Sequence, residues 1–100
     1  MNDNILIVTA TPAPDGQQEM GKYLTSVMPV LQSAGGQLIS RCKISETING
    51  EAGFAMVMTM RFENADTIRK LFASDSYKAL IELRDRGFSK INIMIADDGS

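Results

Sequence analysis

The sequence predicts an α+β domain in which a four-stranded antiparallel sheet carries helices on one of its faces. Three observations lead to this prediction. The apolar segments follow the order strand, helix, strand, strand, helix, strand, and an Asn-Gly pair separates the two middle strands. The 100 residues correspond to a single domain, residues 1–100. This βαββαβ order is typical of the ferredoxin-like fold, in which both helices lie on the same face of the sheet.

The first half of the chain is expected to form one buried strand and one helix. Residues 5–11 are a continuous apolar run rich in β-branched side chains, which indicates a strand covered on both faces. Apolar residues then recur at helical spacing from Met20 to Leu31, and a Gly-Gly pair at 35 and 36 ends the helix. Because Pro29 cannot donate a backbone hydrogen bond, we expect a kink or a break there.

Two strands joined by a hairpin are expected in the middle of the chain. Residues 38–48 alternate imperfectly, with Ser40 on one face and Arg41 on the other. Residues 54–62 alternate more clearly, since one face carries only large apolar side chains, namely Phe54, Met56, Met58, Met60 and Phe62. The opposite face carries the smaller or polar set Ala55, Val57, Thr59 and Arg61. Because two apolar helices need a large complementary surface, we expect the methionine-rich face to lie beneath them.

The stretch from residue 62 to residue 84 is expected to form two short amphipathic helical pieces. Asn64 and Ser74 are good N-cap residues for them, because a short side chain with an oxygen can accept from the free N–H groups of the first turn. Gly87 ends the second piece, and isoleucines at positions 91, 93 and 95 then mark the last strand.

The second face of the predicted sheet has no helix to cover it, although all four strands carry apolar side chains on both faces. An apolar surface of this size is rarely left in water. Two such sheets placed face to face would form a barrel at a dimer axis, with an interface above roughly 1,000 Å² of total buried surface. We therefore expect a homodimer that forms a dimeric α/β barrel.

Composition argues against several classes of partner. The net charge is −2, from 10 basic and 12 acidic residues that are interspersed, and no basic stripe suits nucleic-acid phosphates. No polybasic segment suits a membrane surface, and the N-terminus lacks the positive region and cleavage site of a signal peptide. We expect a cytoplasmic protein that binds neither nucleic acid nor membranes.

The chain has no histidine and only one cysteine, Cys42. This composition rules out Ser-His-Asp and Cys-His catalysis, an intrachain disulfide and a structural zinc site built from this chain alone. We therefore expect neither a metal ion nor a cofactor.

Two short patterns add to the order of the elements. The pair Gly35-Gly36 is followed by a strand that carries Arg41, and residues 72–80 have the pattern aromatic-x-Ser-x-x-Tyr-x-x-Leu. Both patterns resemble those of one family, the dimeric α/β-barrel proteins called domain of unknown function 1330. The chain departs from the family at Asp75-Ser76, where Pro-Glu is usual, and at Arg61, where a glutamate is common. The resemblance covers nearly the whole chain and implies the dimeric barrel fold, but the family has no settled reaction.

Four residues are candidates for binding a ligand: Arg41, Arg61, Thr59 and Tyr77. The planar guanidinium of Arg41 suits a carboxylate or a phosphate, and a solvent-facing edge-strand arginine is an equally good interpretation. Arg61 would form a second cationic wall beside Arg41 if the two strands pair in the right register, and a strand-end charge in water is the favoured alternative. The Tyr77 hydroxyl would orient a ligand, or more simply bond a backbone group while its ring packs under the helix.

Three functions stay open at this point. A small-molecule-binding dimer, with an acidic or aromatic ligand anchored by Arg41, fits the residues best. The second is a cofactor-independent monooxygenase- or isomerase-like enzyme that uses a tyrosine or an aspartate as its acid or base. The third is a structural or protein-interaction module. No pattern of residues establishes a catalytic site, so the sequence does not decide whether the protein is an enzyme.

Overall fold

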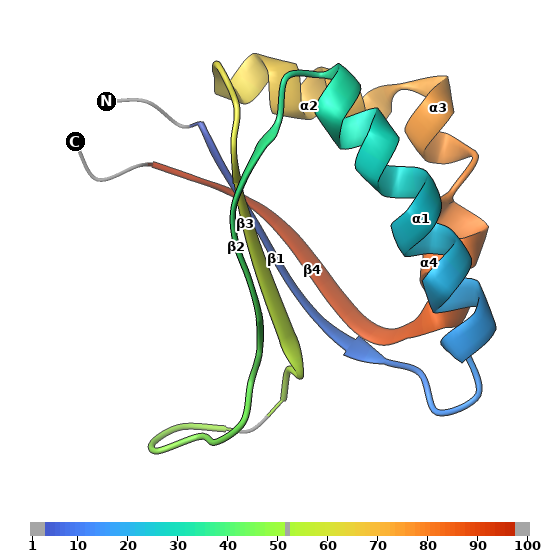
Figure 1. Ribbon diagram of the computed structural model, residues 1–100, viewed down its shortest axis with the longest axis vertical. Helices are drawn as coiled ribbons and strands as arrows, with labels where there is room; N and C mark the ends of the chain where they lie inside the picture. Colours follow the sequence, from blue (N-terminus) through green and yellow to red (C-terminus); the bar gives the residue numbers. More distant parts are fainter. Residues whose placement is uncertain (1–3, 52, 98–100) are drawn as a thin grey trace.

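The computed structural model describes residues 4–51 and 53–97 and shows a twisted sheet with a layer of helices on one side (Figure 1). Four antiparallel strands pair in the order β2-β3-β1-β4. The elements are β1 (Ile5–Pro12), α1 (Gln17–Ser33), β2 (Gln37–Lys43), β3 (Met56–Arg61), α2 (Ala65–Ala73), α3 (Asp75–Lys78), α4 (Ile81–Gly87) and β4 (Phe88–Ala96). This confirms the predicted ferredoxin-like α+β fold, with the second helical region divided into three short helices.

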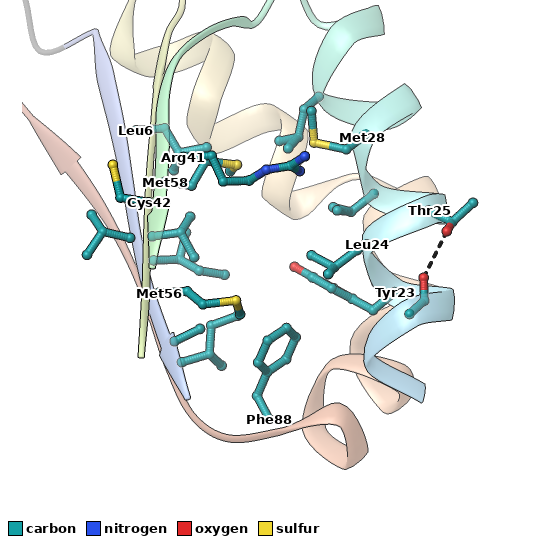
Figure 2. A pocket seen from close by; sticks show the side chains of 18 of the residues that line it. Leu6, Tyr23, Leu24, Thr25, Met28, Arg41, Cys42, Met56, Met58 and Phe88 are labelled. Carbon is teal, nitrogen blue, oxygen red and sulfur yellow. Dashed lines mark hydrogen bonds between the residues drawn. The ribbon is translucent and has the colours of Figure 1, made fainter. Parts of the chain in front are cut away.

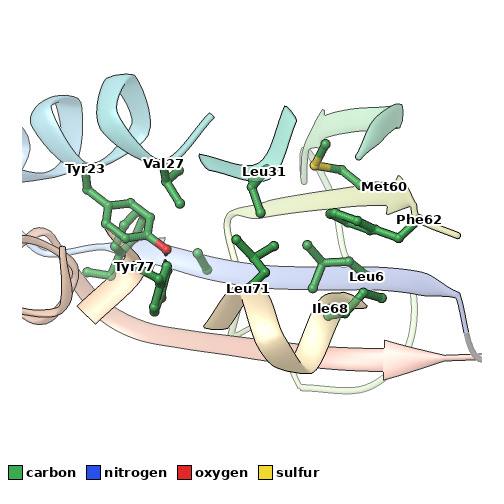
Figure 3. Close-up of a cluster of buried hydrophobic side chains, with 11 residues drawn as sticks. Leu6, Tyr23, Val27, Leu31, Met60, Phe62, Ile68, Leu71 and Tyr77 are labelled. Carbon is green, nitrogen blue, oxygen red and sulfur yellow. Dashed lines mark hydrogen bonds between the residues drawn. The ribbon is translucent and has the colours of Figure 1, made fainter. Parts of the chain in front are cut away.

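The pairing register decides which side chains share a face of the sheet. Leu6 of β1 lies opposite Met60 of β3, and Val8 lies opposite Met58. On the other side of β1, Val8 lies opposite Ile93 of β4. Because directly opposed residues in an antiparallel pair point to the same face, these side chains form one continuous apolar surface. The helices cover this surface, and the hydrophobic core lies between the two layers (Figure 3).

The methionine-rich face of β3 packs beneath the helices, as expected. Met60 and Phe62 are buried, at 0% and 3% exposure, while Met56 and Met58 are half-buried and pack against the core. Burial of a side chain of this size contributes roughly 1.5–3 kcal/mol relative to leaving it in water. Phe54 differs from this pattern because it precedes the strand and is exposed.

Helix α1 continues without a break, although Pro29 lies within it. Its buried residues Tyr23, Val27 and Leu31 are four positions apart, which places them on the side of the helix that faces the sheet. This continuous packing outweighs the one backbone hydrogen bond that Pro29 cannot donate. Gly35, with a φ of 89°, then takes the left-handed conformation that ends the helix.

The two N-caps expected after β3 are both present. Asn64 Oδ1 accepts from the backbone N–H of Thr67 at 2.9 Å, and Ser74 Oγ accepts from that of Tyr77 at 3.2 Å. The chain turns again after Lys78, so the second predicted piece consists of the two helices α3 and α4. The Ser74 cap sets the direction of α3, whose Tyr77 side chain is 2% exposed in the core.

The opposite face of the sheet has no covering element in the described part of the chain (Figure 1). At its centre, Ile7 of β1 lies opposite Thr59 of β3 and Met94 of β4. Met94 is 41% exposed, and Ile7 and Thr59 are partly exposed. This open face therefore mixes apolar and polar side chains, in contrast to the apolar surface that Leu6, Val8, Met58, Met60 and Ile93 form beneath the helices.

Candidate functional site

A cavity of about 590 Å³ lies between α1 and the helix-covered face of the sheet (Figure 2). The cavity exists because β2 and β3 diverge from the helices toward the end that carries their hairpin (Figure 1). Most of the cavity wall is apolar, with contributions from β1, β3, β4 and α1. Its chemistry depends on a few residues of the wall: Tyr23, Met28, Arg41, Lys43, Met56 and Met58.

An irregularity in β2 turns Arg41 toward this cavity. Leu38 lies opposite Met60, and Arg41 lies opposite Met58, so β2 uses one residue more than β3 between these two pairs. The register shifts between Leu38 and Ser40, as it does at a β-bulge. Strict alternation would put Leu38 and Arg41 on opposite faces. The shift places both on the face beneath the helices.

The guanidinium of Arg41 is available to a ligand. Figure 2 shows it extended across the cavity toward Met28 of α1. In residues 4–51 and 53–97 it has neither a hydrogen bond nor an ion pair. Lys43, which lies opposite Met56, adds a second cation to the wall. No described residue of the wall is an aspartate or a glutamate, so the cavity carries a net positive charge.

Tyr23 brings a second kind of polar group to the cavity. Its hydroxyl oxygen lies 3.1 Å from that of Tyr77, which also accepts a hydrogen bond from Arg84 Nη1 at 3.2 Å. Tyr23 is 5% exposed and Tyr77 is 2% exposed. Burial raises the pKa of Tyr23 far above its ordinary value. The Tyr23 hydroxyl therefore stays protonated at neutral pH.

The four residues predicted to bind a ligand do not come together. Arg41 lines the cavity, whereas Tyr77 lies buried behind Tyr23 and does not belong to the wall. Thr59 and Arg61 alternate with Met60 and therefore lie on the open face of the sheet. The register thus separates Arg41 from Arg61 by the thickness of the sheet, and the two do not form a joint cationic wall.

Two other details concern the hydroxyl groups of Tyr77 and Thr59. The ring of Tyr77 packs under the helices as expected, but its hydroxyl bonds the side chains of Tyr23 and Arg84 and, in the described part of the chain, no backbone group. Thr59 Oγ1 lies 2.8 Å from Ser40 Oγ, so its hydroxyl is used within the open face by a cross-strand hydrogen bond.

Sequence reasoning did not count Tyr23 and Lys43 among the site residues. A signal for Tyr23 does exist, since it is the only residue with a polar tip among the buried residues of α1, and buried tyrosines usually find a partner. The partner itself is 54 positions away in the chain, which no local pattern reveals. Lys43 has no such signal, because nothing in the sequence places its face of the strand over a cavity.

The described residues do not include a group of three or more His, Cys, Asp or Glu side chains that could hold a metal ion. In the same ranges, the helices are too short or too polar to cross a membrane.

Comparison with known proteins places this chain by sequence and by fold. The profile of a family described as Domain of unknown function (DUF1330) matches residues 6–98. A search of curated proteins finds no significant match.

Three solved structures illustrate the similarity of fold. A protein of unknown function from Rhodopseudomonas palustris, RPA0582, has a TM-score of 0.77 at 12% identity, over 90% of this chain and 77% of that one. A candidate antibiotic biosynthesis monooxygenase from Bacteroides thetaiotaomicron has a TM-score of 0.66 at 11% identity, over 97% and 90%. A dimeric protein of unknown function with a ferredoxin-like fold, from Bacteroides fragilis, has a TM-score of 0.59 at 9% identity, over 90% of both chains. At such identities the likeness concerns the fold alone.

Proposed function

Because the chain belongs to the family described as Domain of unknown function (DUF1330), whose name carries no activity, we propose a function from the geometry of the cavity. The protein binds a small, largely apolar molecule that carries an acidic group. The observation that carries this proposal is the guanidinium of Arg41, which has no partner among the described residues and extends into an apolar cavity.

The cavity has the size and the chemistry of a ligand site. Small-molecule pockets in proteins occupy roughly 300–1,000 Å³ and combine apolar walls with a few polar groups that fix orientation. Its volume of about 590 Å³ lies within that range. Arg41 and Lys43 supply positive charge without a compensating carboxylate in the described wall, which favours an anion. Met56 and Met58 supply thioether side chains that adapt to varied ligand shapes.

Binding of straight-chain carboxylates to Arg41→Gln, measured by titration calorimetry, tests this proposal. Because Arg41 is exposed, water already screens its charge, and we expect the substitution to weaken binding only about fivefold to tenfold. Arg61→Gln is the matched control, since it removes the same charge from the other face of the sheet. An equal loss of carboxylate affinity in Arg41→Gln and Arg61→Gln would contradict the proposal, as would the absence of binding by the unmodified protein.

We further propose that two copies of the chain pair through the open face. Its apolar side chains include the half-exposed Met94 and the partly exposed Ile7 at the centre of the sheet. The similarly folded protein from Bacteroides fragilis is dimeric, which supports the same arrangement here. The cavity lies on the other side of the sheet, so pairing through this face leaves it accessible.

Light scattering after size-exclusion chromatography at micromolar concentration tests the dimer. The expected mass is twice the 10.9 kDa of one chain. Met94→Glu places a charge on the open face and should give monomers, because an unpaired charge in a buried interface is costly. Ala79→Glu, at an exposed position of the helical layer, should leave the mass unchanged. A wild-type protein at the mass of one chain would refute this part of the proposal.

A second candidate function is that of a cofactor-independent monooxygenase- or isomerase-like enzyme. The protonated hydroxyl of Tyr23 at the cavity favours it, since such a group can donate a proton or stabilise a developing enolate. Binding without turnover is the better supported of the two, because the described wall contains no carboxylate or imidazole to remove a proton. Oxygen uptake or substrate isomerisation that is lost in Tyr23→Phe would reverse this order.

A further inference from the structure

Three side chains from different elements form a chain of hydrogen bonds that ends at the cavity. Arg84 of α4 donates from Nη1 to the hydroxyl of Tyr77, and that hydroxyl lies 3.1 Å from the hydroxyl of Tyr23 on α1. The guanidinium carbon of Arg84 also lies 5.9 Å from the centre of the Tyr77 ring. Tyr23 lines the cavity, and Figure 2 shows its hydroxyl end directed into the space between α1 and the sheet.

The direction of these bonds follows from the inventory of donors and acceptors. A guanidinium has only donors, so the Tyr77 oxygen must accept from Arg84. The hydrogen of the Tyr77 hydroxyl then needs an acceptor, because Tyr77 is 2% exposed and a buried donor without a partner is costly. Among the described residues, the remaining partner of that hydroxyl is the oxygen of Tyr23. Tyr77 therefore donates to Tyr23.

This direction leaves the hydrogen of the Tyr23 hydroxyl without an acceptor among the described residues. The hydroxyl lies at the wall of the cavity, so water or a ligand can supply the acceptor.

We propose that the cavity recognises molecules with two oxygen functions: an acidic group that Arg41 holds and a carbonyl oxygen that accepts a hydrogen bond from Tyr23. The two groups lie on different walls, Arg41 on β2 and Tyr23 on α1, with apolar side chains between them. The ligand class is thus an oxo-carboxylate whose apolar body joins the two oxygen functions. This inference rests on the proposed ligand-binding function and adds the second point of recognition.

Calorimetry with matched probes tests the inference. The probes are straight-chain carboxylates of increasing length, each paired with an oxo-carboxylate of the same length in which a carbonyl replaces one methylene. At the length that spans the cavity, we expect the oxo probe to bind about threefold to tenfold tighter than its partner, the gain of one net hydrogen bond. Tyr23→Phe should abolish this gain, so that the two probes of a pair bind to it equally tightly.

Two further variants separate recognition from structural effects. Arg41→Gln should weaken the binding of both probes of a pair by the same factor, so that the ratio of their dissociation constants stays the same. Tyr77→Phe removes a buried hydroxyl of the same cluster but leaves the donor of Tyr23 in place, so the preference for the oxo probe should persist. Infrared spectra give an independent measure, since the carbonyl stretch of the bound oxo probe should move to lower frequency in the wild type and not in Tyr23→Phe.

The outcomes distinguish this inference from the proposed function. Plain carboxylates that bind through Arg41, without a gain for any oxo probe, would refute the role of Tyr23 and leave the proposed function standing. Tighter binding of the oxo probe that persists in a folded Tyr23→Phe protein would also refute the role of Tyr23 and leave the proposed function standing. No binding by any probe of either series would refute the proposed function and, with it, this inference.

Discussion

Two methionines on the same face of β3 should respond differently to truncation. Met60 is 0% exposed and sits in the core, so Met60→Ala leaves an enclosed void. Removal of a buried methionine side chain in this way costs about 2–5 kcal/mol. Met58 is half-buried and already borders the cavity, so Met58→Ala only enlarges a space that exists. Its cost is the lost contact area alone, roughly 1 kcal/mol.

Urea unfolding followed by circular dichroism measures both costs. For a protein of this size the free energy of unfolding falls by about 1–3 kcal/mol per molar urea, so a loss of about 3 kcal/mol lowers the midpoint by roughly 1–3 M. Met58→Ala should lower it by less than half as much. All proteins are compared at one chain concentration, because unfolding of a dimer depends on concentration. Equal shifts for the two variants would show that the wall beside Met58 is closely packed, and would refute the cavity on which the proposed function depends.

Two other predictions concern stability. The pKa of the Tyr23 hydroxyl is raised in the folded protein above the unfolded value of 10.0, so the stabilisation is fully present below about pH 10 and is lost as pH rises above it. Urea titrations from pH 9 upward should therefore show a steeper decline for the wild type than for Tyr23→Phe, and parallel declines would contradict the burial of this hydroxyl. A Cβ at Gly36 would lie 2.6 Å from Cζ of the Phe62 ring, whereas one at Gly21 meets nothing within 4 Å. Gly36→Ala should thus lower the melting temperature, while Gly21→Ala should raise it by removing a glycine from a helix interior, and a scanning calorimeter that found the same sign for both would refute this reasoning.

The sequence by itself determined the order of the elements and the face of β3 that is buried. Alternation with a period of two separates Met60 from Thr59, and the N-caps Asn64 and Ser74 act on backbone groups three residues away. These are properties of residues that are close in the chain, so they can be read without knowledge of the tertiary structure. The one long-range expectation that also held, the ferredoxin-like arrangement, follows from the order of the elements because few topologies suit that order.

Only the tertiary structure decided which residues meet at the cavity. The register shift in β2 moved Arg41 to the helix-covered face, away from Arg61, and a shift of one residue changes the face of every side chain beyond it. The hydrogen bond between Tyr23 and Tyr77 likewise joins residues 54 positions apart. Such contacts depend on how separate elements pack against one another, and the sequence around each partner does not predict that packing.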